Sequence, residues 1–379
     1  MRKTMITAVA ASAALAAGVA TMPADATDGA HAGKGPVPRY KVVAQNLHNP
    51  RQITFAHGDM YVAEAGQGGH GACLPDPEAP PPAQVCYGPT GSVTRVRAGK
   101  QHRVLKGLPS IGAEGTGSSS IGPSDLAVVG KHTLVVSIGF GSAPKNRAMF
   151  SKYAQKQLAH LMSFNLATGK RTSVGDLGRH EAKTNPVDNR DTDPSGVAKA
   201  GKLGFVVTDS GGNTVVSAKA GKVKSVAAFQ DRKGISPITG PEPKTYQSVP
   251  TDIVRGPDGA WYVSELTGFP FIQGAARIWR IVPGHKPHVW AKGLTNVTSL
   301  AFDGKRLYAV QISDAGLAAG GPPIGSLRRV FPKSSGKASK PIVSGVFAPY
   351  GVAIHHGAAY LSTGSVDPAN GSVIKVPLG

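Results

Sequence analysis

Apolar and polar residues alternate in pairs of short runs that recur six times along the chain. In each copy a proline, replaced once by Val297, and a pair of small or polar residues lead into the first run. A tight glycine turn and a second run follow, and the second run ends in a polar residue in five copies. The copies span residues 49–66, 122–139, 193–211, 249–268, 296–313 and 348–364. Such alternation predicts β-strands, and its recurrence predicts one repeated supersecondary unit.

Further strands can be assigned between the copies. A third strand follows each copy, at residues 92–96, 160–164, 215–217, 277–281, 327–330 and 372–376. A fourth strand precedes the next copy, at residues 103–106, 171–174, 223–227, 288–291 and 341–343. The sixth copy is not followed by a fourth strand, but residues 40–44 (YKVVA) form an unassigned strand before the first copy. In a closed ring this N-terminal strand completes the last blade and removes an exposed sheet edge.

The predicted fold is an all-β, six-bladed β-propeller with four-stranded blades, in which the N-terminal strand closes the last blade. A solenoid does not need a strand returned from the far terminus, and a β-sandwich does not predict a six-fold repeat. The predicted domains are a signal peptide over residues 1–26, a flexible mature N-terminus over 27–38 and a single propeller over 39–379. Successive copies lie 73, 71, 56, 47 and 52 residues apart, so the first two blades hold the largest insertions.

The two ends of the predicted strands differ in loop length. With the strands of a blade labelled a to d from the channel outward, the a–b and c–d turns share one face, here called the turn face. The b–c loops and d–a crossovers share the other, here called the loop face. Four b–c loops are long and irregular, at residues 65–91, 140–159, 266–276 and 314–325. Because binding sites lie preferentially on loops carried by a rigid scaffold, we predict that the loop face is the functional one.

Polar side chains gather where the strands reach the loop face. The ends of the b strands and the starts of the a strands line the predicted channel mouth, and their candidate ligand or metal residues are Glu64, Asp125, Asp209, Asp252, Glu265, Gln311 and Arg51. Such oxygen ligands suit Ca²⁺ or Mg²⁺, and a bound divalent ion beside a carboxylate base hydrolyses lactones or esters in metal-dependent hydrolases. The alternative is structural: the acids pair with Arg51 or accept backbone N–H groups at strand ends.

The N-terminal sequence predicts export. Arg2 and Lys3 precede an uncharged run over residues 5–20, and residues 24–26 (ADA) are small enough for cleavage after Ala26. This pattern is typical of a Sec-type signal peptide, and the run is shorter than the ~20 apolar residues that a membrane span needs. We predict a secreted monomer with no transmembrane segment in the mature form.

The two cysteines of the chain, Cys73 and Cys86, both lie in the first long loop. In an exported protein such a pair predicts a disulfide that clamps the loop. The alternative, a metal-binding pair, requires His or acidic partners from elsewhere in the chain.

The charge of the chain is strongly positive, with a formal net charge of +20. Basic residues gather on the turn face: Arg97, Lys100, Lys131, Lys170, Arg171, Lys202, Lys219, Lys222, Lys286, Lys305, Arg306, Lys333 and Lys337. They indicate either well-solvated turns or a weak, salt-sensitive association with an anionic polymer of the cell envelope or a membrane surface. Specific nucleic-acid recognition is not predicted, because the basic residues are not interleaved with aromatic residues, which make up only 6% of the chain.

The repeat residues also carry a family resemblance. The pattern P-[ST]-[DG]-[IL]-[AV], followed by a glycine turn and [WY]-[YV]-V-[AS]-E, is similar to the ScyD/ScyE family, with residues 249–281 as the nearest stretch. The resemblance extends over essentially the whole mature chain. It implies an exported six-bladed propeller related to the NHL-repeat and lactonase-like groups, and it implies no catalytic residues.

Two functions therefore stand as hypotheses. The first is a secreted binding scaffold whose loop face engages a small-molecule or protein ligand. The second is a Ca²⁺-dependent hydrolase of the lactonase or esterase type that uses the acids at the channel mouth. Likeness to calcium-dependent lactonases is an analogy of fold, and a fold alone does not assign a function.

Overall fold

The computed structural model describes residues 40–76, 79–185, 191–236, 238–332 and 340–378. The predicted signal peptide (residues 1–26), the predicted mature N-terminus (27–38), and the turn-face residues Lys333 and Lys337 lie outside the described residues.

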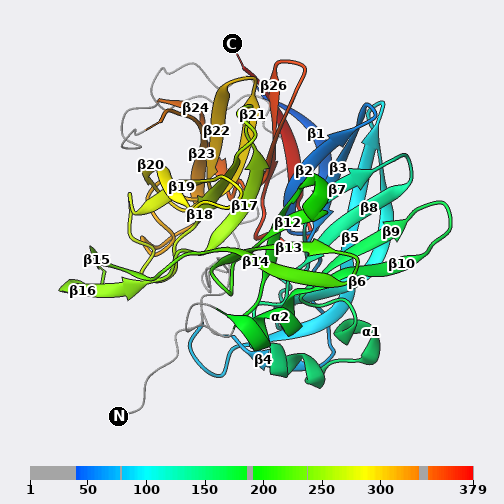
Figure 1. Cartoon of the computed structure of the whole chain (residues 1–379). Helices are drawn as coiled ribbons and strands as arrows, with labels where there is room; N and C mark the ends of the chain where they lie inside the picture. The colour runs from blue at the N-terminus through cyan, green and yellow to red at the C-terminus, as the bar shows by residue number, and fades with distance from the viewer. Residues whose placement is uncertain (1–39, 77–78, 186–190, 237, 333–339, 379) are drawn as a thin grey trace.

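The described strands form six antiparallel blades arranged in a ring (Figure 1), which confirms the predicted propeller. Blade 1 contains β2 (Pro50–Ala56), β3 (Asp59–Glu64), β5 (Gln84–Arg97) and β6 (Lys100–Ala113). Blade 2 contains β7 (Pro123–Val129), β8 (Thr133–Ile138), β9 (His160–Asn165) and β10 (Arg171–Asp176). Blade 3 contains β11 (Pro194–Lys199), β12 (Phe205–Asp209), β13 (Thr214–Lys219) and β14 (Lys222–Ala228).

The second half of the ring repeats the same order. Blade 4 contains β17 (Pro250–Arg255), β18 (Trp261–Glu265), β19 (Ala276–Ile281) and β20 (His288–Leu294). Blade 5 contains β21 (Val297–Asp303), β22 (Arg306–Gln311), β23 (Ile324–Val330) and β24 (Pro341–Phe347). Blade 6 contains β25 (Val352–His355), β26 (Ala358–Thr363), β27 (Gly371–Pro377) and, as its outer strand, β1 (Lys41–Leu47).

The N-terminal strand closes the ring as predicted. Strand β1 pairs with β27, with Lys41 opposite Lys375 and Leu47 opposite Gly371. The side chain of Leu47 is fully buried, and it packs in a cluster shared between blades 6 and 1. The first and last described strands therefore belong to one sheet.

The apolar core is divided among the blade interfaces. One cluster lies between each pair of neighbouring blades. Successive side chains of a strand point to opposite faces of the sheet, so each blade contributes apolar side chains to the clusters on both of its sides. Leu134 and Phe164, for example, pack against blade 1 from blade 2. The ring thus has six apolar interfaces between blades, and the closing strand contributes to the one between blades 6 and 1.

The loop face carries elements that the sequence pattern did not predict. They are β4 (Cys73–Pro75), the 3-10 helix η1 (Pro144–Met149), α1 (Lys152–Gln155), α2 (Leu177–Thr184) and the hairpin of β15 (Arg232–Ser236) with β16 (Gly240–Tyr246). In Figure 1, β4, α1 and α2 lie below the ring, and the hairpin projects from it at the lower left. None of the helices within the described ranges is long and apolar enough to cross a membrane.

Candidate functional site

The last residue of each b strand lies buried at the loop face. In four blades its side chain accepts a hydrogen bond from the crossover, one or two residues before the a strand: His48 N to Glu64 Oε2 (2.8 Å), Asp193 N to Asp209 Oδ1 (2.6 Å), Ser248 Oγ to Glu265 Oε1, and Thr295 N to Gln311 Oε1 (2.9 Å). Buried acceptors need such partners, since an unmade hydrogen bond costs about 1–3 kcal/mol. The repeated polar residue at the end of the b strand therefore fixes the crossover to the sheet, and we call it the latch residue.

Two of these polar residues, Glu64 and Glu265, also form an ion pair in which the carboxylate is fully buried and the arginine is partly exposed. Arg103 of β6 places Nη2 2.7 Å from Glu64 Oε2, and Ser92 and Thr94 donate to the other oxygen. Both Glu64 oxygens are thus occupied inside blade 1.

The second pair joins the projecting hairpin to blade 4. Arg232 of β15 donates Nη1 to Glu265 Oε1 (2.8 Å) and Nη2 to Glu265 Oε2 (2.7 Å), while Trp279 Nε1 and the backbone N–H of Arg277 complete the acceptor sites. The Glu265 side chain is fully buried. Its arrangement is a fork of two parallel hydrogen bonds, the strong geometry for Arg and a carboxylate.

Replacing Arg232 with methionine should lower the free energy of unfolding by about 3–5 kcal/mol, because Glu265 is left buried without its counter-charge. Urea unfolding at neutral pH measures this loss. Lys233→Met is the matched control, since Lys233 is an exposed neighbour on the same strand, and its effect should stay within about 0.5 kcal/mol. Equal losses in the two variants would contradict a stabilising role for the pair.

The acids of the a strands connect neighbouring blades. Asp125 Oδ2 accepts from Val197 N (2.6 Å) of blade 3, and Asp252 Oδ2 accepts from Leu300 N (2.8 Å) of blade 5. In both, the second carboxylate oxygen accepts from the next residue of its own strand. These two candidates therefore bind backbone N–H groups, as the structural alternative predicted.

A series of hydrogen bonds between side chains connects blades 4, 5 and 1 at the channel. Ser299 Oγ of blade 5 donates within 2.7 Å of Gln52 Oε1 of blade 1 and lies 2.9 Å from Asp252 Oδ2. Blade 6 lies between blades 5 and 1 in the ring. Its Gly351 lets the backbone of Gln52 come close, because a Cβ at this position would lie only 2.8 Å from the Gln52 Cα. The centre of the ring is thus a packed polar region.

Arg51 lies in the same region but forms no ion pair among the described residues. Its guanidinium donates to the carbonyl oxygens of Ser365 (3.1 Å) and Ser120 (2.5 Å) and lies 4.6 Å from the centre of the Tyr350 ring. Burial lowers the pKa of Arg51. The candidate acids therefore do not follow the first option of the structural alternative, an ion pair with Arg51; carbonyl oxygens, an aromatic face and the charge of Asp193 stabilise this cation.

Two buried acids at the mouth escaped sequence analysis. Asp191 and Asp193 precede β11 and, with Asp209, bring three carboxyl groups into electrostatic contact. Burial, reinforced by the charge of Asp209, raises the pKa of Asp193 from 3.8 to about 7. Burial also raises the pKa of Asp191 well above its ordinary value. The run Asp-Thr-Asp before Pro194 was the available signal, because in other copies the residues just before the a strand donate to the polar residue that ends the b strand.

The same effect extends to the a-strand acids. Burial raises the pKa of Asp252 from 3.8 to about 6, and burial with the charge of Asp252 raises the pKa of Asp125 well above its ordinary value. The protonated form of both carboxyl groups is thus favoured relative to an exposed acid.

The mouth acids do not form a calcium site. Within the described ranges, the group of three acidic, His or Cys residues whose ligand atoms all lie within 4.8 Å of one another is Cys73, Cys86 and Glu114. None of the mouth acids belongs to it, and its sulfur atoms are bonded to each other. Because Ca²⁺ takes six to eight oxygen ligands, these residues do not fit the ion, and we derive no step through it.

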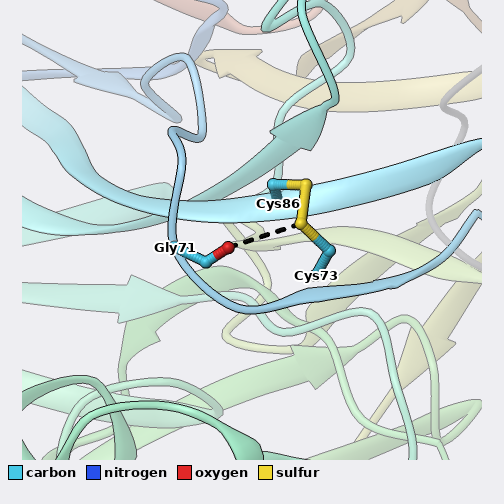
Figure 2. The surroundings of a disulfide bond; sticks show 3 residues. All are labelled: Gly71, Cys73 and Cys86. Atoms are coloured by element: carbon cyan, nitrogen blue, oxygen red, sulfur yellow. Dashed lines mark hydrogen bonds between the residues drawn. A yellow bond between two sulfur atoms is a disulfide. The ribbon is translucent and has the colours of Figure 1, made fainter.

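The disulfide is the predicted one (Figure 2). The Cys73–Cys86 bond has an S–S distance of 2.03 Å and joins β4 to β5 across a Cα–Cα distance of 4.1 Å. Cys73 Sγ lies 3.3 Å from the Gly71 carbonyl oxygen, a contact without a proton because the sulfur is oxidised. The bond clamps the blade 1 loop on the loop face.

Comparisons with known proteins find similarity of structure only. No family model and no curated protein sequence matches the chain. Similar solved structures include virginiamycin B lyase from Staphylococcus aureus, with 12% identity, a TM-score of 0.46, and coverage of 90% of this chain and 100% of that one. An oxidoreductase described as a glucose dehydrogenase from Thermus thermophilus has 13% identity, a TM-score of 0.32, and coverage of 86% and 80%.

A third similar structure is a puromycin-hydrolysing peptidase from Mycobacterium tuberculosis, with 11% identity and a TM-score of 0.42. The match covers 92% of this chain and 55% of the peptidase. These proteins differ in chemistry, and at such similarities none of their activities transfers to this chain. The fold assignment rests on its own sheet topology.

Proposed function

We propose that the protein is a binding scaffold of the ScyD/ScyE type that acts outside the cytoplasm and engages a protein ligand through its loop face. The candidate polar residues at the mouth are committed to internal hydrogen bonds, which favours a scaffold over a catalyst. The hydrolase hypothesis gains no support from the described residues, because it needs a convergent set of oxygen ligands.

The observation that carries the proposal is the apolar surface beside the hairpin. Ile235 (60% exposed) and Ile238 (53%) lie on the β15–β16 hairpin, and Phe269 (45%) lies on the blade 4 loop. The two segments pack on each other: a Cβ at Gly234 would lie 2.7 Å from Ile272, and Arg232 donates to the carbonyl of Ala275. Exposed apolar side chains gathered on adjoining segments are typical of protein–protein interfaces.

The shape of the hairpin also favours a protein partner. A two-stranded hairpin is marginally stable in water by itself, and most of this one is exposed. Its base is fixed by the Arg232–Glu265 pair and by the Tyr246 ring, 5.0 Å from the Arg232 guanidinium. A rigid base and an exposed tip suit a projecting contact arm better than a small-molecule pocket, which would be concave.

Site-specific photocrosslinking in culture tests this proposal. A crosslinking residue at position 238 should form protein adducts outside the producing cells, and Phe269→Ser should reduce them at least about tenfold, since apolar anchors carry most interface energy. A crosslinker at position 203, an exposed leucine on the turn face, is the matched control. Equal adducts at both positions, or no adduct at 238, would overturn the proposal; an adduct to a second copy would identify the partner as the chain itself.

A further inference from the structure

Acidic side chains are scarce on the turn face, whereas basic side chains occur on both faces. In the described chain, the acids at the turns are Asp59, Asp258 and Asp303. Two of them are already neutralised, with Asp59 2.7 Å from Arg97 and Asp258 2.7 Å from Arg280. The turn face therefore offers almost no free negative charge.

Many cations on this face have no counter-charge. Exposed basic residues at the a–b and c–d turns that form no ion pair within the described ranges are Lys100, Lys131, Lys170, Lys199, Lys202, Lys219, Lys222, Arg255, Lys286, Lys305 and Arg306. Arg171 is also exposed and without an ion pair, and its guanidinium donates to the neutral Tyr153 hydroxyl. The remaining cations produce a positive field over the face that attracts anionic partners.

The charge is densest on blade 3. Its two turns carry Lys199 and Lys202 on one side and Lys219 and Lys222 on the other, and all four are exposed. The turns touch, because Lys219 Nζ donates to the Lys202 carbonyl oxygen at 3.1 Å.

Two of these lysines stand directly opposite each other. Lys219 pairs with Lys222 in the β13–β14 register, and like charges in directly opposed positions destabilise a sheet. A bound anion would relieve this repulsion. The arrangement is costly for an isolated propeller and favourable for one in contact with negative charge.

The apolar residues of the face argue for a hydrophilic partner. Its exposed large apolar side chains include Tyr40 on blade 6, Val129 on blade 2, Leu203 on blade 3, and Phe331 and Ile342 on blade 5. They are distributed over four blades, whereas membrane-surface binding combines charge with a continuous apolar surface that enters the lipid. We propose that the turn face, centred on the four blade 3 lysines, binds a linear polyanion with repeating phosphate or carboxylate groups.

Salt-dependent binding tests the proposal with the full chain. Fluorescent linear polyphosphate and poly-glutamate are the probes, and Kd is measured by anisotropy over a series of sodium chloride concentrations. Changing Lys199, Lys202, Lys219 and Lys222 to glutamine should weaken binding at least about tenfold and reduce the salt slope by about 3, since each contact to a flexible polyanion contributes about 0.7 to the slope. The tighter of the two probes identifies the anionic group.

The matched control removes the same charge from the other face. Lys145, Lys152, Lys156 and Lys183 are exposed on the loop-face helices or beside them, and their change to glutamine should leave the slope unchanged. An equal loss in both quadruple variants would overturn the proposal, because net charge alone would then explain binding. Binding to anionic vesicles but to neither polymer would also overturn it, in favour of a membrane surface. Melting temperatures no lower than that of the unchanged protein exclude misfolding as the cause, and the relief of the Lys219–Lys222 repulsion should raise that of the blade 3 variant.

Discussion

Deleting residues 41–47 should abolish the cooperative unfolding of the propeller and leave most of the chain insoluble. The deletion removes strand β1, whose Leu47 is fully buried and whose backbone pairs with β27. Loss of a buried leucine alone costs about 2–5 kcal/mol, and each lost ladder hydrogen bond adds about 0.5–1.5 kcal/mol. The sum is comparable to the whole stability of a typical domain, about 5–15 kcal/mol.

The matched control is a chain that begins at Tyr40 and keeps β1. It should give a single cooperative transition by circular dichroism, and Leu47→Ala in that chain should lower its stability by about 2–5 kcal/mol without abolishing folding. A synthetic peptide of residues 40–47 added to the deleted chain should restore part of the transition. The closure model fails if the deleted chain melts like the control.

The fold could be read from the sequence because closure imposes the same requirements on every blade. The a-strand start and the b-strand end are opposite one another, as Pro50 with Glu64 and Pro250 with Glu265, so the proline and the latch residue recur at fixed spacing. The hairpin and the helices that lie outside the repeated blades could not be predicted from the sequence pattern. Strand β16 contains two prolines, which normally argue against a strand, and helix α2 has eight residues and little apolar content.

The candidate site was harder to predict, because a polar residue's role depends on partners distant in sequence. The sequence placed Glu64 and Glu265 at the loop-face ends of their b strands, but Arg103 and Arg232, which occupy their oxygens, come from other strands. Nothing in the local sequence indicates whether a carboxylate is free or already paired. Five acids near one channel therefore looked like a metal site, although each has its own donors.

Replacing Asp193 with asparagine should stabilise the protein in a pH-dependent manner. The pKa of Asp193 is raised by burial and by Asp209 from 3.8 to about 7, so the stability that this residue contributes is fully present below about pH 4 and is lost as the pH rises through 7. A rise of about three pKa units corresponds to about 4 kcal/mol. The asparagine has no charge to bury, and it keeps an oxygen for the Phe140 N–H, now 3.0 Å from Asp193 Oδ1.

The difference in unfolding free energy between Asp193→Asn and the unchanged protein should therefore grow between pH 4 and pH 8, by up to about 4 kcal/mol. Urea titrations across this range measure it. Asp258→Asn should show the opposite trend. Burial is the largest single influence on Asp258 and opposes its ionisation, but the hydrogen bonds from Arg280, Ala260 N–H and Tyr262 and the charge of Arg280 together lower the pKa. That variant therefore loses stability only above about pH 4. A pH-independent effect of Asp193→Asn would mean that its carboxyl group does not carry the repulsion with Asp209, and the buried acids would then be structural hydrogen-bond acceptors alone.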